Sequence, residues 1–518
     1  MKIYNPMPEK TRQNEITEAD KKRSLKYSIY DGSVWGIMTG FGDQYVTPFA
    51  VELGVSAFVI GLITSIPALF SSFAQLFNAA ATDLLHSRKK VILVCVFLQA
   101  LMWAPLALIP FIVPQEYVEP VILLSAIALL VFGGFGGPPW ASIMGDLVPK
   151  ETMGEFFGRR NRIVGAVTFT SILTAGFILD IFKTRGSALY GFSALFTVAL
   201  IARLLSFYFL TKHVEMPYRS PKSAHFSFLQ YLIKLPKTNY GHFAIYLALM
   251  NFSVNVAGPF FAVYMLRDLN LSYAEYTIVT VAVTITSFLT MTMWGRAADK
   301  FGNKHILNVT GMLLPLVPVV WLFGYSVSYL IVIQMLSGFV WAGFNLSTFN
   351  FIYENVRPTK RTRVTAYQNA INGGSIFVGG IIGGYLAIHI TDPWIFKSPL
   401  QFLFLLSGIL RLLISLLMLP RIQEVREVEE PRIPIIPWRL GLSRSNLGLR
   451  PIFYPIQTSQ PVRNISRIIR EAPEGVSKMI HEAPDEVSRI IRDAPEEALY
   501  RLKVRPKSDG KRKQTNRR

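Results

Sequence analysis

Long apolar blocks with almost no charge divide most of this chain, and they constrain its fold more than any other feature. Each block has about twenty residues, the length at which an α-helix crosses roughly 30 Å of hydrocarbon. A soluble protein would instead spread its apolar residues with a period of 3.6 or 2. We therefore predict an all-α polytopic membrane protein with twelve transmembrane helices. The predicted spans are residues 28–50, 56–80, 91–113, 120–146, 162–181, 189–211, 241–266, 273–294, 305–325, 328–353, 364–389 and 398–420.

The basic residues are distributed unevenly between the predicted loops. The formal net charge of +20 could indicate a nucleic-acid partner. If the N-terminus is cytoplasmic, however, the inner loops hold nineteen Lys and Arg residues and the outer loops hold four. Because cytoplasmic loops are enriched in positive charge, we predict a multi-pass cell-membrane protein with both termini cytoplasmic and no nucleic-acid partner. The polar start of the chain shows no cleavable signal peptide.

The sequence repeats itself on the two sides of a polar linker. The matching features, in the same order, are Pro48-Phe49 with Pro259-Phe260, Asp146-Leu-Val-Pro149 with Glu354-Asn-Val-Arg-Pro358, and Arg203 with Arg411. We therefore predict two six-helix halves related by duplication. The predicted domains are a cytoplasmic segment 1–27, a first half 28–211, the linker 212–240, a second half 241–420 and a basic cytoplasmic tail 421–518.

One segment between two predicted spans, residues 295–304, is dense in charge and glycine. It reads Gly-Arg-Ala-Ala-Asp-Lys-Phe-Gly-Asn-Lys, and a carboxylate between two cations cannot lie in hydrocarbon. We predict a tight turn at a membrane face, where glycine permits close helix packing and positive φ angles. The spacing Gly-x-x-x-Asp-Lys-x-Gly-x-Lys resembles the cytoplasmic signature loop of the major facilitator superfamily (MFS) of secondary transporters, of the prokaryotic type.

This resemblance covers residues 28–420, about four fifths of the chain. It implies two pseudo-symmetric six-helix bundles that rock around a midplane cavity, which helices 1, 4, 7 and 10 line. The first half departs from the pattern, because its segment Asp83-Leu-Leu-His-Ser-Arg88 keeps the acid but lacks the glycines. The residues to which the resemblance assigns a role in gating are Gly295, Arg296, Asp299, Lys300, Gly302 and Asp83.

The sequence lacks the motifs that would indicate an enzyme. It contains no Gly-x-x-x-x-Gly-Lys-Ser/Thr phosphate loop, and its one cysteine, Cys95, excludes a multi-cysteine metal site. The glycine run at 133–137 has no preceding strand, so we interpret it as a helix-packing surface. We predict no cofactor and no metal, and we expect an ion gradient or the substrate gradient to supply the energy.

Polar side chains inside the predicted spans are the candidates for substrate and proton binding, because a charge at the bilayer centre costs roughly 2.5–3.5 kcal/mol. Asp43 lies in the first span beside Gln44, with no basic residue near it in sequence. A carboxylate withdrawn from water holds a proton more readily, so we predict that Asp43 carries the proton. The alternative is that water in the cavity wets Asp43, which then only orients the substrate.

Four amides lie in the predicted helices 7 and 10, which line the cavity if the resemblance holds. Asn251 and Asn255 are four residues apart and share a helix face, and Asn345 and Asn350 follow in helix 10. We predict that these amides contact a small-molecule substrate. The alternative is hydrogen bonding between helices, which is common for amides in membranes.

Charged residues near the cytoplasmic helix ends predict a gate latch at the corners between helices 4 and 5 and between helices 10 and 11. The residues concerned are Asp146, Arg159, Glu354 and Arg363. The pseudo-twofold relation places Asp299 opposite residues 158–162, where a helix N-terminus and three arginines favour an anion. Arg203 and Arg411 hold matching places in the repeat, which favours a structural role over binding an anionic substrate or snorkelling.

The tail contains an 11-residue unit that occurs three times within residues 466–498. Eleven residues make three helical turns, so the apolar positions would align on one face, although each unit also contains a proline. One interpretation is a set of short amphipathic helices that contact anionic lipid or a cytoplasmic partner. The other is a weakly ordered, solvated tail.

We therefore predict a secondary active transporter that moves a small organic solute through the bilayer by alternating access, as a proton-coupled symporter. The alternatives are an uncoupled facilitator, a proton-driven exporter of amphipathic compounds and, of another class, a membrane receptor or scaffold that acts through its tail. The Gly-Pro motif of many drug–proton antiporters is absent from residues 162–181, which weakens the exporter hypothesis. The sequence does not identify the substrate.

Overall fold

The computed structural model describes residues 17–149, 152–215, 227–356, 358–390 and 396–424. Within these ranges every regular element is a helix, so the predicted all-α class is confirmed. Ten helices of this part of the chain are long and apolar enough to cross a bilayer. The first and ninth predicted spans are broken into shorter helices. The first sixteen residues, the middle of the linker and the repeat-containing tail from residue 425 lie outside the described residues.

The first half contains six spans, several of them interrupted. Its elements are α1 (Glu18–Phe41), the 3₁₀ turn η1 (Asp43–Tyr45), α2 (Val46–Glu52), α3 (Ala57–Ala74), α4 (Asn78–Leu85), α5 (Arg88–Leu101), α6 (Trp103–Ile112), α7 (Val118–Leu147), α8 (Met153–Thr184) and α9 (Ala188–Thr211). Side-chain oxygens of Thr17, Ser56 and Ser87 accept backbone N–H groups in the first turns of α1, α3 and α5. Such caps define where each helix begins.

The second half repeats this order after the linker helix α10 (Phe228–Lys234). Its elements are α11 (Asn239–Asn255), α12 (Phe260–Val263), the π-helical turn η5 (Tyr264–Asp268), α13 (Tyr273–Phe301), α14 (Asn303–Leu313), α15 (Leu316–Val320), α16 (Val327–Asn355), α17 (Pro358–His389), α18 (Pro399–Met418) and the 3₁₀ turn η6 (Leu419–Arg421). In both halves the first span breaks just before the matched prolines, Pro48 and Pro259, because proline lacks the N–H that continues a helix.

The signature segment is helical over most of its length. Helix α13 continues to Phe301 and α14 begins at Asn303, so Gly302, with a φ of +87°, forms the turn between them. The prediction of a turn throughout residues 295–304 is therefore wrong for residues 295–301. Arg, Ala and Lys extend a helix readily, so the charged segment marks a membrane face and not a helix end.

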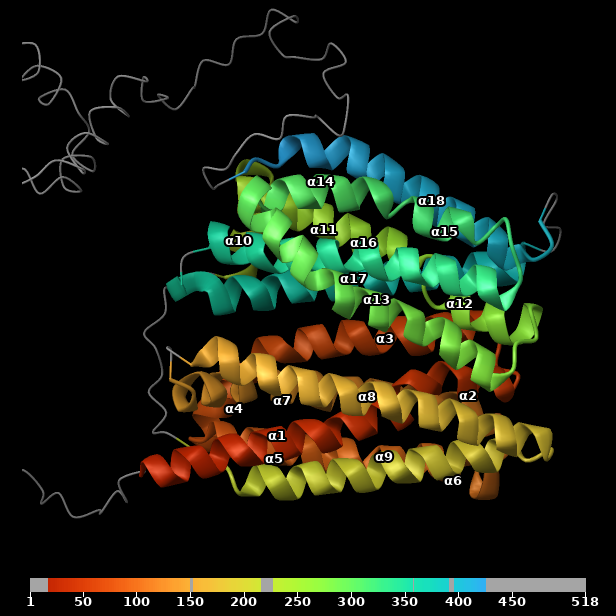
Figure 1. The fold of residues 1–518 in the computed structure, drawn as a ribbon, viewed down its shortest axis with the longest axis horizontal. Coiled ribbons are helices and arrows are strands. Elements are labelled where there is room, and N and C mark those ends of the chain that lie inside the picture. Colours follow the sequence, from red (N-terminus) through yellow and green to blue (C-terminus); the bar gives the residue numbers. More distant parts are fainter. Residues whose placement is uncertain (1–16, 150–151, 216–226, 357, 391–395, 425–518) are drawn as a thin grey trace, which may run out of the picture. The chain divides into compact units, whose positions relative to one another are not determined.

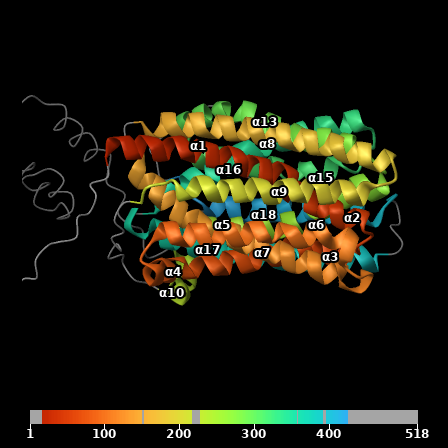
Figure 2. The ribbon, with the colours of Figure 1, turned by 90° about the horizontal axis from the view of Figure 1, so that it is seen from below.

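Two pairs of long helices make most of the contact between the halves, α3 with α17 and α8 with α13 (Figure 1 and Figure 2). Glycines allow α17 to approach its neighbours closely. Gly380 lies against Ser65 of α3, and Gly383 lies against the Val256 carbonyl that follows α11. A side chain at either glycine would collide with these atoms, so α17 can pack between its neighbours only with a bare backbone at these points.

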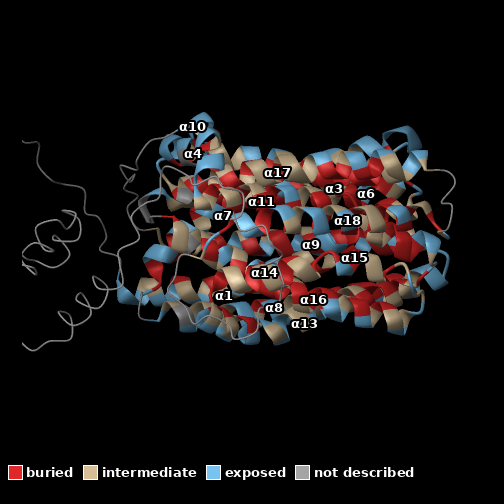
Figure 3. Cartoon of the chain, turned by 90° about the horizontal axis from the view of Figure 1, so that it is seen from above, coloured by how far each residue is buried: buried red, intermediate tan, exposed pale blue. Residues whose placement is uncertain are grey.

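The two ends of the helices differ in how the halves meet. We call the end that carries the start of α1, helix α10 and η6 the inner end, and the opposite end the outer end (Figure 1). At the outer end one large cluster of buried apolar side chains draws on both halves, including Phe49 and Phe196 from the first and Phe260 and Phe404 from the second. Towards the inner end, smaller clusters each belong to one half. Exposed residues are visible there on α4 and α10 (Figure 3).

Candidate functional site

The first span breaks at Gly42, and this break presents two polar side chains. Gly42 lies against the ring of Trp103, where a Cβ atom would be 2.5 Å from Cη2, so a side chain does not fit. The following turn η1 leaves Asp43 and Gln44 exposed. Arg203 of α9 is close enough to attract the Asp43 carboxylate. The predicted proton carrier is thus an accessible acid at a helix break, close to a buried cation.

The four predicted amides have different surroundings. Asn251 and Asn255 are both half-buried. The Nδ2 of each donates to the backbone carbonyl four residues earlier on α11, at a distance of 2.9 Å. On α16, Asn345 is exposed, whereas Asn350 donates to Asn303 Oδ1 at 3.1 Å. The Asn350 amide therefore bonds α16 to α14 in this structure, while Asn345 remains accessible to a ligand.

A buried acid on α1, Asp31, is the residue that the apolar pattern did not single out. Ser206 of α9 donates to Asp31 Oδ1 at 2.6 Å and accepts a hydrogen bond from Arg203 Nη1 at 3.0 Å. Arg203 Nε also donates to Gln99 of α5 at 2.8 Å, and Arg160 of α8 is close enough to attract Asp31. Asp31 and Ser206 are 175 residues apart, so no local motif could have revealed this network.

Arg411 holds the matching position on α18 but has different partners. It is buried, its Nε donates to Ser407 Oγ at 3.1 Å, and its Nη1 donates to the Leu314 carbonyl at 3.3 Å. Among the residues that the structure describes, no carboxylate contacts it. Both arginines therefore connect helices within one half, which agrees with the predicted structural role.

Polar contacts cross between the halves at the outer end. Tyr273 of α13 donates to the Glu52 carboxylate of α2 at 2.6 Å. Arg267 of η5 donates to the Val55 carbonyl, between α2 and α3, at 2.9 Å. Together with the shared apolar cluster, these bonds close the outer end.

At the inner end, two predicted latch residues make contacts within their own half. Arg88 Nη1 pairs with Asp146 at 2.7 Å, and Asn303 donates to Glu354 at 2.7 Å. The partner of Asp146 thus comes from α5 and not from α8. Of the other predicted gating residues, those that are exposed are Asp83, Arg159, Arg296, Asp299 and Lys300, and those that are half-buried are Gly295 and Arg363.

A glutamate that follows the last span of each half caps the third span of that half. Glu215 accepts the Arg88 backbone N–H at 2.6 Å, and Glu424 accepts the Lys304 backbone N–H at 2.9 Å. Helix N-termini favour negative charge, so these acids fasten the chain after α9 and α18 to α5 and α14. Neither was predicted, because both lie beyond the apolar blocks.

The turn before each capped helix contains a residue with a positive φ angle, directly before α14 in the second half and two residues before α5 in the first. Gly302 has a φ of +87° and His86 has a φ of +49°. This region is easily reached by glycine and is unfavourable for residues with a side chain. The first signature segment thus also has a positive φ although it lacks the glycine, but in a different conformation: ψ is 25° at His86, in the left-handed helical region, and 154° at Gly302.

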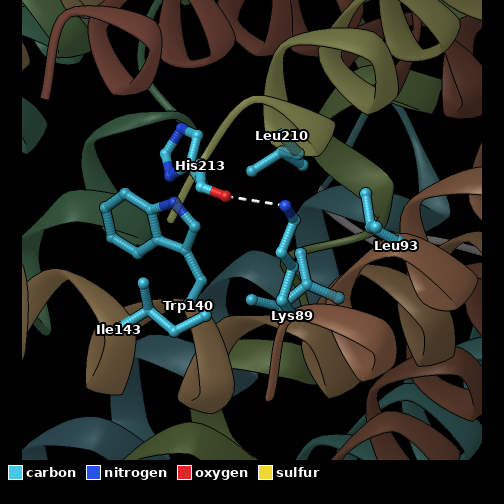
Figure 4. Close-up of a pocket in the computed structure, with 7 residues that line it drawn as sticks. Lys89, Leu93, Trp140, Ile143, Leu210 and His213 are labelled. Atoms are coloured by element: carbon cyan, nitrogen blue, oxygen red, sulfur yellow. Dashed lines mark hydrogen bonds between the residues drawn. The ribbon is translucent and has the colours of Figure 1, made fainter. Parts of the chain in front are cut away.

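A small pocket lies between Trp140 and His213 at the inner end of the first half (Figure 4). Lys89 Nζ donates to the His213 carbonyl at 2.6 Å. Burial, together with the nearby Lys89 ammonium, lowers the pKa of His213 to about 4, so its ring is neutral at physiological pH. Within the described residues, Trp140 Nε1 and His213 Nε2 have no hydrogen-bond partner. The space suits a bridging water better than an organic solute.

Comparison with known sequences gives a match to a family model and a match to a characterised relative. The model of the Major Facilitator Superfamily matches residues 33–254 and, again, residues 243–459. The multi-drug resistance efflux pump PmrA of Streptococcus pneumoniae is 26% identical over 303 residues, which are 57% of this chain and 71% of that protein.

Solved structures of transporters share the fold. The nucleoside transporter NupG has a TM-score of 0.58 at 16% identity, over 78% of this chain and 98% of its own. A D-xylose-proton symporter has a TM-score of 0.57 at 15% identity, over 79% of this chain and 99% of its own. At such identities the likeness shows the fold alone, which is two pseudo-symmetric six-helix bundles.

Proposed function

The chain belongs to the major facilitator superfamily and is a secondary transporter, and from this premise we propose that protons drive it, with Asp43 as the proton carrier. Such proteins move small molecules through the bilayer as their two halves rock around a central site. The observation that carries the proposal is an accessible carboxylate at the break of the first span, with the Gln44 amide beside it.

The surroundings of Asp43 suit a reversible proton site. Its exposure allows protons and substrate to reach it. The positive charge of Arg203 attracts Asp31 as well as Asp43, and its guanidinium is already bonded to Gln99 and Ser206. Among the described residues Arg203 forms no close ion pair with Asp43, so no bonded cation keeps this carboxylate permanently ionised.

The test begins with a search for a transported compound. The purified protein is screened by thermal shift against nucleosides, sugars and amphipathic cations, since a ligand at one hundred times its Kd stabilises a protein by about 2.7 kcal/mol. Uptake of a stabilising compound is then measured in proteoliposomes with and without a proton gradient. For Asp43→Asn we expect accumulation against a gradient to be lost, while exchange of labelled for unlabelled solute continues.

Two further variants show whether the charge itself matters. Asp43→Glu should restore coupled accumulation, and Glu119→Gln, which neutralises an exposed acid of α7, should leave it unchanged. Gradient-driven accumulation by Asp43→Asn would assign the proton to another group. Absence of any proton dependence in the unmodified protein would instead identify an uncoupled facilitator.

A second candidate function is proton-driven export of amphipathic compounds, which the similarity to PmrA favours. Cells that express this chain should then retain less ethidium than control cells. An uncoupler that collapses the proton gradient should remove the difference. Equal ethidium retention in both kinds of cell would count against export of this compound class.

We also propose that both termini are cytoplasmic, which the excess of basic residues in the inner loops supports. The receptor or scaffold alternative can be tested by truncation. The chain should be cut after Glu424 and not before it, because Glu424 caps α14 and so belongs to the helical body. A transporter should keep its solute flux without residues 425–518, whereas a scaffold should lose its activity.

A further inference from the structure

The short turn η1 lies between an accessible surface and the shared core. Asp43 and Gln44 are exposed, whereas Tyr45, the third residue of the same turn, is 1% exposed and belongs to the cluster that joins the halves. A 3₁₀ turn places three residues in one revolution. A shift of the backbone at Asp43 therefore also displaces Tyr45.

The start of this turn is held in place by packing. Trp103 is completely buried, and its ring occupies the space that a side chain at residue 42 would need. Close packing of this kind resists sliding of the backbone. Gly42 is also the residue whose dihedral angles can change at the lowest steric cost. The turn can thus pivot at Gly42 while Trp103 prevents it from sliding.

The Tyr45 hydroxyl bonds to both sides of the interface between the halves. It donates to the Ile172 carbonyl of α8 at 2.8 Å and accepts from Thr277 Oγ1 of α13 at 2.9 Å. Ile172 belongs to the first half and Thr277 to the second. Tyr45 and Thr277 are both buried, so a hydroxyl that loses this bond finds no water in its place and the loss is unfavourable.

This bond lies where α8 and α13 cross. A Cβ atom at Gly176 of α8 would collide with the Thr277 side chain, which shows how closely the two helices approach. Opening of the outer end has to separate the first half from the second there. The Tyr45–Thr277 bond must therefore break when the outer end opens.

We propose that Tyr45 is a positioning residue that transmits the state of the Asp43–Gln44 site to the outer closure. Occupation or neutralisation of that site shifts η1, moves the Tyr45 hydroxyl away from Thr277 and favours opening of the outer end. This inference rests on the proposed function only in taking Asp43 and Gln44 as the site. It does not require that the coupled ion is a proton.

The experiment measures access to the outer end directly. Cys95 is the one cysteine of the chain, so Cys95→Ser provides a background without thiols, and Val55→Cys places a reporter at the outer closure. The rate of labelling by a membrane-impermeant maleimide is measured in reconstituted protein. Tyr45→Phe keeps the ring and removes the hydroxyl with both of its bonds, of which only the bond to Thr277 crosses between the halves. We therefore expect labelling to accelerate roughly three- to tenfold. Thr277→Val should have the same effect.

A double-mutant cycle tests transmission. We expect Asp43→Asn alone to accelerate labelling, and to have no further effect in the Tyr45→Phe background. The matched control is Tyr264→Phe, because that hydroxyl accepts a bond from Gln401 within the second half and is equally buried. It should leave the labelling rate and its response to Asp43→Asn unchanged.

Two results would overturn the inference: an unchanged labelling rate in Tyr45→Phe, or additive effects of Tyr45→Phe and Asp43→Asn. Proton coupling is read from accumulation in proteoliposomes and not from labelling. Its failure would therefore leave the labelling cycle interpretable. A thermal melting measurement on each variant identifies any change that merely reflects unfolding.

Discussion

The two halves place a buried arginine at the same point of the repeat and give its charge different partners. Arg203 in the first half is linked through Ser206 to the carboxylate of Asp31. Arg411 in the second half bonds to one hydroxyl and one backbone carbonyl. The same side chain thus takes part in a charged network in one half and in neutral hydrogen bonds in the other.

This difference indicates where the molecule concentrates its charge. In the first half, Asp31, Arg160 and Arg203 connect α1, α8 and α9, and Arg203 also attracts the exposed acid Asp43. The second half packs its helices with hydroxyls and backbone groups around Arg411. The first half thus places a buried charged network near the exposed Asp43, whereas the described contacts of Arg411 in the second half are neutral.

The largest expected effect concerns these two arginines. Arg203→Met leaves Asp31 buried without its Ser206-linked cation; because the link runs through a hydroxyl and Arg160 stays near Asp31, we expect a cost of about 1.5–3 kcal/mol, that of a lost hydrogen bond to a charged group. Arg411→Met removes a buried charge and leaves no acid behind, so its cost should stay within about 1 kcal/mol. Melting temperatures of the two purified variants check the comparison.

The double variant Asp31→Asn/Arg203→Met provides the control for the first half. It should melt at a higher temperature than Arg203→Met, because no buried carboxylate then lacks its partner. Equal destabilisation by Arg203→Met and Arg411→Met would show that packing of the side chain, and not its charge, matters in both halves.

A second comparison uses the two signature acids. By the pseudo-twofold relation, Asp299 should stabilise the closed inner end through attraction to the arginines near residue 160. The segment around Asp83 lacks the glycines of the signature pattern, so we expect Asp83 to contribute less. We expect Asp299→Asn to slow transport about tenfold, the loss of roughly 1.4 kcal/mol of charge interaction, and Asp83→Asn to slow it less. Initial rates of solute uptake measure this. Equal losses in both variants would defeat the proposed asymmetry of the gate.

The smallest expected effect concerns the turns beside these acids. His86→Gly should stabilise the protein by about 0.5–1 kcal/mol, because glycine adopts a positive φ without steric strain. Gly302→Ala should destabilise it, both through its φ of +87° and because a Cβ there would meet the Glu424 carboxylate. Thermal melting of the pair provides the measurement. We expect the melting temperature to rise in His86→Gly and to fall in Gly302→Ala. If it changed in the same direction in both variants, a preference for glycine would not explain the two turns.

The apolar blocks are sufficient to predict the fold class, because the bilayer imposes the length and composition of each helix. Asp43 could be singled out for the same reason, as a charge inside such a block. The family is predicted by the signature segment at residues 295–304. Asp31 escaped notice because it lies near the charged start of α1, and because its partners on α8 and α9 are distant in sequence. A polar residue near a span end carries no local sign of burial.

The limits of the signature segment show a second kind of error. Charge alone does not mark a turn: residues 296–301 contain neither glycine nor proline, and the helix continues through them. The contacts at the outer end, such as Tyr45 with Thr277, could not be predicted either. They depend on which side of the transporter is closed, and this is a property of one conformation and not of the sequence.

The bare backbone of α17 has a consequence for how often its contacts can be broken. Where α17 meets α3 and α11 through Gly380 and Gly383, glycine contributes no side-chain rotamers that must be fixed when the contact forms. Ordering a glycine backbone is costly, but that cost arises once, when the chain folds. Each later separation and return of the two halves can then re-form the contact of Gly380 with Ser65 of α3 with little loss of conformational entropy.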